Sequence, residues 1–484
     1  MKKLTSLVLV SVLASIVHAV EAPKIDTSND RVKAKLYIPY QQLGVVVPKN
    51  VSQVGDNFTL GCETLDRDYA DYDAYKEYLA PLGVKTIRLQ GGWAKTEKVK
   101  GVYDFAWLDH IINDALSRGL KVWLQTSYGN PIYEGGGTPF LKGGMPTSKE
   151  AKDAWDKWVN AMVKRYGGKV SWEVWNEPDL NKSISSWAML ELNIRTSDII
   201  LKHDPKAEIS AFSLVNINKS RYKYLIQKLY EKGKLDNFKW FCYHAYRYRP
   251  EEPYAGIEEM YDFLRQYSKK VILRQGENGA PSRGGMGGAL SLHFPWSEYT
   301  QAKWNLRRLL GDWGRGIETS VFSISDMNYA STDSIKVKNV KGLLGTDDKN
   351  RIIKIKIAYY AVQNLASVFG LLDKQTGKQK ISKELSDIID AFGYIDTETG
   401  VQSFTIWQND TIPSSNCATM PVDVEIKGGA KLMDPVWVDI LTGRVFEIPS
   451  SKISREGDVL KIKDFPIYDS PILVTEKGLV EFKK

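Results

Sequence analysis

Between about residues 55 and 369, short apolar runs rich in β-branched residues alternate with longer stretches of helical periodicity. The short runs have the length and composition of buried strands, and the longer ones have the pattern of amphipathic helices. Strands are expected at 58–62, 84–90, 120–127, 169–177, 207–214, 238–246, 270–277 and 318–326. Helices are expected at 71–82, 104–118, 148–166, 185–203, 219–233, 257–269, 298–313 and 354–369. Eight strands, each followed by a helix, predict an α/β fold with a (β/α)8 TIM barrel over residues 55–370.

The pattern changes after residue 370. Short alternating segments follow one another, separated by turns rich in Gly, Pro, Asn and Asp, at 400–407, 421–427, 435–440, 458–463 and 471–475. This pattern predicts an antiparallel β-sandwich accessory domain over residues 371–484. The N-terminal segment 23–54 contains apolar runs at 36–38 and 45–47, and it offers a further strand to that sandwich.

The first residues have the pattern of a secretory signal peptide over residues 1–22. Lys2 and Lys3 precede an apolar run at 7–17, and Ala19 and Ala22 fit small-residue cleavage sites. The run is too short to cross a bilayer, and no other apolar stretch approaches spanning length. We therefore expect an exported protein, periplasmic or secreted, with no membrane span.

Composition narrows the possible partners. The net charge of +8 arises from 66 basic and 58 acidic residues without a dense basic block, which argues against a nucleic-acid partner. The 14 Trp and 25 Tyr supply flat faces of the kind that stack on sugar rings, so an oligo- or polysaccharide partner fits the composition. The three cysteines and the histidines show no zinc-site spacing, and we expect no metal and no cofactor. The oligomeric state stays open.

Two carboxylates stand at predicted strand ends. In a (β/α)8 barrel the reactive groups lie at the C-terminal ends of the strands. Glu177 closes the fourth strand, in Trp175-Asn176-Glu177-Pro178, and Glu277 closes the seventh. These strands face each other across the barrel, so the two side chains can converge as the carboxyl pair of a retaining glycosidase. Glu177 is then the acid/base, Glu277 the nucleophile, and Asn176 a ligand for a substrate hydroxyl.

The sequence Trp175-Asn176-Glu177-Pro178, followed by Asp179-Leu180, resembles the acid/base motif of the clan A glycoside hydrolases. With Leu180 it is similar to glycoside hydrolase family 39, which holds β-xylosidases and α-L-iduronidases. The resemblance runs from the second strand to the eighth. Around Glu277, Gly276-Glu277-Asn278 departs from the Thr-Glu-Trp or Thr-Glu-Phe more common in family 39, so the resemblance leaves the sugar open.

The resemblance also implies roles for other residues. Arg88 ends the second strand, where the clan has an arginine beside the nucleophile. His244 and Tyr246 are similar to the clan's His/Tyr pair, whose tyrosine reaches the nucleophile. From their positions on expected mouth loops or at the end of the eighth strand, we also include as substrate-binding candidates Trp93, Tyr128, Asn130, Trp296 and Asp326.

Two classes of function remain. The retained carboxylates favour a working glycosidase over a barrel that binds carbohydrate without cleaving it. Within the first class, an exo-acting β-glycosidase such as a β-xylosidase competes with an endo-acting glycanase. The long loops 129–147 and 278–297 would wall off a pocket in the first case and border an open cleft in the second.

Overall fold

The computed structural model describes residues 21–484 except 218, 286–288, 291–293, 333–334, 371–373 and 379–386. Most of the expected signal peptide, residues 1–20, lies outside the described residues. Among the described helices, none combines the length and the apolar character needed to cross a membrane.

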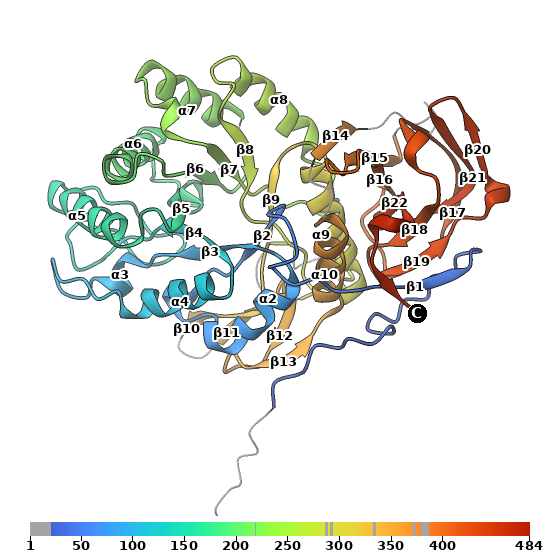
Figure 1. Ribbon diagram of the computed structural model, residues 1–484. Coiled ribbons are helices and arrows are strands. Elements are labelled where there is room, and N and C mark those ends of the chain that lie inside the picture. Colours follow the sequence, from blue (N-terminus) through green and yellow to red (C-terminus); the bar gives the residue numbers. More distant parts are fainter. Residues whose placement is uncertain are drawn as a thin grey trace, which may run out of the picture.

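Eight parallel strands close into a barrel in chain order (Figure 1), which confirms the predicted fold class. Its strands are β2 (Phe58–Gly61), β3 (Thr86–Gln90), β4 (Lys121–Thr126), β5 (Val170–Val174), β6 (Ile209–Leu214), β7 (Trp240–Tyr243), β8 (Ile272–Gln275) and β9 (Glu318–Val321). Almost all their residues are buried, as expected for parallel strands covered by helices outside and filled by side chains inside.

Helices surround the barrel close to the predicted positions, except for α3, which the sequence pattern did not predict. They are α1 (Tyr72–Tyr75), α2 (Leu79–Leu82), α3 (Trp93–Thr96), α4 (Ala106–Ser117), α5 (Lys149–Tyr166), α6 (Ser186–His203), α7 (Lys219–Glu231), α8 (Tyr254–Arg265), α9 (Glu298–Trp313) and α10 (Ile357–Phe369). N-cap residues begin several of them. The Ser148 side chain accepts a hydrogen bond from the Ala151 amide, and Ser297 and Thr300 form a capping box. The expected single helix at 71–82 is instead α1, a 3₁₀ turn (Lys76–Tyr78) and α2.

Six of the eight predicted strands extend past the observed C-terminal ends, whereas those predicted at 84–90 and 207–214 end where β3 and β6 end. The strand expected at 169–177 ends at Val174, and the one expected at 318–326 ends at Val321. The predictions extend too far because apolar residues continue past the end of each strand, in segments whose backbone already bends toward the barrel mouth. Glu177 and Ala245, for example, have positive φ angles of 47° and 59°, far from the extended values of a regular strand.

Two hairpins that the sequence pattern did not predict follow β9. They are β10 (Met327–Thr332) with β11 (Ile335–Asn339), and β12 (Leu344–Thr346) with β13 (Ile352–Ile355). The chain passes through both before α10, so the predicted start of that helix, at 354, falls within β13.

The C-terminal region forms two antiparallel sheets beside α9 and α10 (Figure 1). The larger sheet has the order β14-β15-β16-β22-β18-β19-β1-β23, and the smaller has the order β17-β21-β20. Their strands are β1 (Gln42–Val46), β14 (Lys374–Lys378), β15 (Ile389–Ile395), β16 (Gln402–Gln408), β17 (Met420–Lys427), β18 (Pro435–Asp439), β19 (Arg444–Glu447), β20 (Ile453–Glu456), β21 (Val459–Ile467), β22 (Ile472–Glu476) and β23 (Phe482–Lys483). The N-terminal strand β1 thus lies between β19 and β23.

Buried polar contacts and stacked rings join this region to the barrel helices. Lys303 on α9 forms an ion pair of 2.6 Å with Asp469, and the Trp313 ring stacks on Tyr394 with centroids 4.8 Å apart. Because paired charges and aromatic area are both buried there, the sheets brace α9 against the barrel.

Candidate active site

The backbone leaves β5 through a kink that directs Glu177 into the barrel mouth. Trp175 and Glu177 both have φ in the left-handed region, 63° and 47°, which costs a residue with a side chain about 1 kcal/mol each. Two contacts hold the kink: the Glu177 amide donates to the Ser213 carbonyl at 2.9 Å, and Pro178 opens a 3₁₀ turn. The sequence Trp-Asn-Glu-Pro therefore sets the direction of the Glu177 side chain.

Glu277 reaches the same mouth from β8. Gly276 precedes it, and a β carbon at that position would lie 2.2 Å from the Cys242 sulfur. Only glycine lets the chain pass this close to β7. Beyond it, the Asn278 side chain donates to the His244 carbonyl at 2.5 Å, which ties the end of β8 to the end of β7.

The two carboxylates meet around His244. A carboxylate oxygen of Glu177, one of Glu277 and a ring nitrogen of His244 all lie within 4.8 Å of one another. His244 Nδ1 lies 2.7 Å from Glu177 Oε1 and 3.8 Å from Glu277 Oε2. Both side chains are largely buried, with 8% of Glu177 and 13% of Glu277 exposed. The pair is therefore close enough for both groups to act on one bond.

Burial determines the protonation states of Glu177 and His244. It raises the pKa of Glu177 to about 8, and the nearby negative charge of Asp179 adds to the effect while Arg88 and Lys341 oppose it. Burial also lowers the pKa of His244 to about 4. At neutral pH, Glu177 is thus a protonated acid beside a neutral imidazole.

Two donors fix the Glu277 carboxylate. The Tyr246 hydroxyl donates to Oε1 at 2.9 Å, and Arg88 Nη1 donates to Oε2 at 3.2 Å. A cation and a neutral donor on opposite oxygens orient the carboxylate. The environments of Glu177 and Glu277 therefore differ, as an acid and a nucleophile require.

Arg88 is the centre of a buried polar cluster. It is fully buried, and its guanidinium binds Glu173 through two bonds of 2.7 Å, Glu63 at 2.8 Å and Asn176 at 2.7 Å, besides Glu277. Its partners lie on or just after three other barrel strands, β2, β5 and β8. It contacts both Glu277 and Asn176, the residue next to Glu177.

Two members of this cluster, Glu63 and Glu173, were not predicted from the sequence. Glu63 lies two residues after the end of β2, so it meets the same strand-end criterion as Glu177 and Glu277. Burial raises its pKa, and the negative charge of Glu277 contributes to that rise. Glu173 lies inside β5, where no strand-end signal marks it, and only its inward direction in the barrel identifies it.

Of the remaining predicted residues, Tyr128 and Asn176 join the cluster. The Tyr128 hydroxyl accepts from Asn176 at 2.9 Å and from Gln90 at 3.0 Å. Both residues line a cavity of about 600 Å³ together with Glu177 and Glu277. The Arg67 guanidinium also lines it and packs on the Tyr128 ring, 4.9 Å from the centroid.

The structure gives four other candidates different surroundings. Trp93 packs among Tyr133, Trp155 and Trp158. Asn130 donates to the Glu97 carbonyl at 2.8 Å and so braces its own loop. The Trp93 ring and the Asn130 amide are thus already engaged by neighbouring core groups, so both residues have structural roles.

Trp296 and Asp326 likewise lie outside the carboxylate cluster. The Trp296 ring stacks on Tyr248 with centroids 6.2 Å apart, and its indole nitrogen donates to the Leu290 carbonyl. The Asp326 carboxylate accepts from Lys356 Nζ at 2.6 Å and from the Gly342 amide at 3.0 Å. Its partners give Asp326 a role in loop structure.

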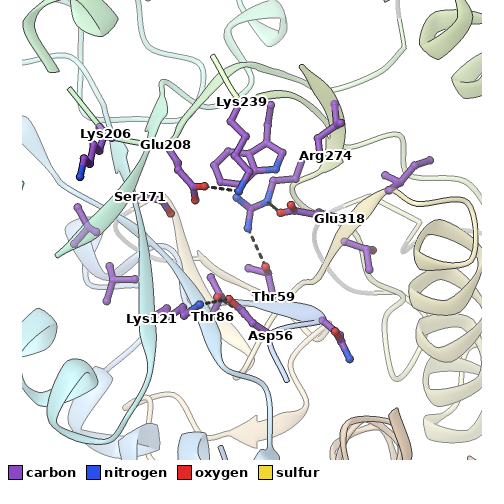
Figure 2. A pocket seen from close by; sticks show the side chains of 18 of the residues that line it. Asp56, Thr59, Thr86, Lys121, Ser171, Lys206, Glu208, Lys239, Arg274 and Glu318 are labelled. Atoms are coloured by element: carbon purple, nitrogen blue, oxygen red, sulfur yellow. Dashed lines mark hydrogen bonds and ion pairs between the residues drawn. The ribbon is translucent and has the colours of Figure 1, made fainter. Parts of the chain in front are cut away.

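A larger cavity, of about 930 Å³, lies at the opposite end of the barrel (Figure 2). Its charged groups pair with one another: Lys121 with Asp56 at 2.8 Å, and Lys239 with Glu208. Arg274 lies between these pairs, stacked over the Trp123 ring at 3.7 Å. Groups at this end of a (β/α)8 barrel serve stability, so the smaller cavity is the candidate active site.

Glu177, His244 and Glu277 also have the atom types of a metal site. Two of the three ligand atoms already share a hydrogen bond of 2.7 Å. Arg88 contacts the third residue, so an added cation would meet an existing positive charge. The arrangement suits proton transfer and nucleophilic attack better than metal binding.

Comparisons with known proteins agree with this chemistry. Residues 51–273 match the family model for cellulase (glycosyl hydrolase family 5). The curated β-galactosidase BgaA of Clostridium cellulovorans is 29% identical over 137 residues, which cover 24% of this chain and 20% of that protein. The match therefore spans only a fifth of the relative's length.

Solved structures share the fold over most of the chain. A family 39 glycoside hydrolase from Bacteroides cellulosilyticus WH2 superposes with a TM-score of 0.63 at 16% identity, covering 89% of this chain and 83% of that one. A β-xylosidase from Caulobacter crescentus CB15 gives 0.55 at 12% identity, with coverage of 89% and 97%. A family 30 endoxylanase from Clostridium papyrosolvens C71 gives 0.54 at 12%, with 90% and 98%. Over residues 51–273 the chain is thus similar to glycoside hydrolases in sequence, in agreement with the resemblance stated from the sequence, and it shares their fold.

Proposed function

We propose that the protein is a retaining glycoside hydrolase in which Glu277 is the nucleophile and Glu177 the acid/base. The observation that carries the proposal is the close approach of two carboxylates in unlike environments: their oxygens lie within 4.8 Å. Retaining enzymes hold their carboxyl groups about 5–5.5 Å apart, whereas inverting enzymes leave room for a water at about 6.5–9.5 Å.

The geometry supports a two-step reaction in which the two carboxyl groups have different roles. In the first, Glu277 attacks the anomeric carbon while protonated Glu177 gives its proton to the leaving oxygen. In the second, Glu177 takes a proton from a water molecule as the water oxygen attacks the anomeric carbon, and the bond between the sugar and Glu277 breaks. The neutral His244, 2.7 Å from Glu177, can orient the carboxyl group through both steps.

We further propose exo action on a β-glycoside such as a β-xyloside. Two loops support a walled pocket: Phe140, Leu141 and Lys142 line the cavity from the loop before α5, and Tyr329 and Val337 line it from the β10–β11 hairpin. Walls on two sides favour the end of a chain over its middle. Incubation with xylo-oligosaccharides should release single sugars. Mixed oligosaccharides as first products would mean an endo-acting glycanase instead.

The stereochemical prediction tests the mechanism directly. Double displacement inverts the anomeric centre twice, so the first-formed product should keep the configuration of the substrate. Proton NMR during the first minutes of hydrolysis, before mutarotation, measures this. A product of inverted configuration would exclude Glu277 as a nucleophile.

The raised pKa of Glu177 predicts the alkaline side of the activity profile. Because the first step needs the protonated acid, kcat/KM on a substrate with a poor leaving group should fall as pH rises through about 8. Glu177→Ala should lack this limb on an aryl glycoside with a good leaving group, which needs no proton. A limb that persists unchanged in the variant would belong to another group.

A further inference from the structure

Lys341 lies in the turn between β11 and β12, and its backbone is held from both sides. The Asn339 side chain accepts from its amide at 3.2 Å, and Gln301 Nε2 donates to its carbonyl at 3.0 Å. The next amide, of Gly342, donates to Asp326 at 3.0 Å. These contacts fix the turn without using the lysine side chain.

The Lys341 ammonium is buried without a counter-ion. Among the described residues, Lys303, Lys341 and Lys356 are the buried lysines. Lys303 and Lys356 each form an ion pair of 2.6 Å, whereas Lys341 Nζ has no hydrogen-bond partner in the described part of the chain. Burying an unpaired ammonium is costly, so a fold that does so needs a compensating gain.

The side chain points toward the reacting carboxylates. Its ammonium lies 5.6 Å from the centroid of the Tyr246 ring, whose hydroxyl donates to Glu277. Burial lowers the pKa of Lys341 to about 8, and the negative charges of Glu277 and Glu177 act in the opposite direction. A cation over a phenol ring draws electron density from it and makes the hydroxyl a better donor.

We propose that Lys341 is a positioning residue of the reaction, whose buried charge acts through Tyr246 and across the pocket to keep Glu277 in its carboxylate form. The proposal rests on the proposed function and adds a second cation to Arg88. Lys341 lies outside the barrel strands, in the turn between β11 and β12. This explains why the fold tolerates an ammonium that contributes nothing to the turn that carries it.

Other groups also face this part of the site and are held constant in the test. The charged or titratable side chains that interact with Glu277 from neighbouring elements are Glu63 after β2, Arg88 on β3, Tyr128 after β4, Glu177 after β5, His244 and Tyr246 after β7, and Tyr329 on β10.

The test is the pH profile of Lys341→Met, which removes the charge and keeps a chain of similar length. Without the cation both carboxylates hold protons more tightly, so both limbs of kcat/KM should move upward by about one pH unit. Thermal stability should stay equal or rise, because an unpaired buried charge has been removed. A purely structural lysine would show the reverse: a lower melting temperature and unmoved limbs.

Lys338→Met is the matched control. Lys338 lies on β11, three residues before Lys341, but its ammonium donates to the Thr346 carbonyl at 2.8 Å and pairs with Asp348 at 3.4 Å. It should leave the profile in place, and an equal shift in both variants would overturn the proposal. The wild type's retention of configuration tests the proposed function separately, so a retaining enzyme with an unmoved Lys341→Met profile would overturn only the role of Lys341.

Discussion

Glu277→Ala should lose at least about 10⁴-fold in kcat on every glycoside, because no glycosyl-enzyme can form without the nucleophile. The loss should be the same for good and poor leaving groups. Azide can occupy the vacated space, but it then attacks the substrate directly and yields a product of inverted configuration. Rates for a pair of aryl glycosides that differ in leaving-group pKa measure the effect.

Glu177→Ala serves as the contrast within the same cavity. On poor leaving groups it should lose about 10²–10⁴-fold, the usual contribution of a general acid. On good leaving groups the first step needs no proton, so the loss should be much smaller. Azide should then restore turnover with retained configuration. Equal losses on both substrates in both variants would contradict the assignment of roles.

Much of this site could be predicted because the barrel converts sequence order into spatial order. Strand ends converge at one face, so a Glu after the fourth strand and a Glu after the seventh must meet. Tyr246 and Arg88 were expected from the resemblance to clan A, and the structure brings both to Glu277 at 2.9 and 3.2 Å, although Arg88 lies inside β3 and not at its end. The strand-end rule works because it depends on topology and not on side-chain detail.

The same rule also explains the failures. Trp93 and Asn130 were candidates because they stand on mouth loops, but a loop residue can turn toward the core, and the packing of Trp93 on Trp158 could not be read from the sequence. Lys341 was missed for the opposite reason. It comes after an unpredicted hairpin, so nothing in its local sequence relates it to β5 or β8.

Arg88→Met should lower both activity and stability, and the two effects can be separated. The arginine pairs with Glu173 and Glu63 as well as Glu277, and all these side chains are largely buried. Removing it leaves buried carboxylates unpaired, which costs about 3–5 kcal/mol of unfolding free energy. The loss of the cation beside Glu277 should also move the acid limb of the pH–rate profile upward.

The double variant Arg88→Met/Glu173→Gln separates these effects. Glu173 accepts two of the arginine's hydrogen bonds. Replacing it with glutamine therefore removes the most deeply buried of the carboxylates that Arg88→Met leaves unpaired. Urea unfolding should therefore recover part of the lost stability, while the acid limb stays high because Glu277 still lacks its cation. Tyr246→Phe should shift that limb less, since only a neutral donor is lost. If the double variant instead regained both stability and the wild-type limb, Arg88 would brace the barrel without acting on Glu277.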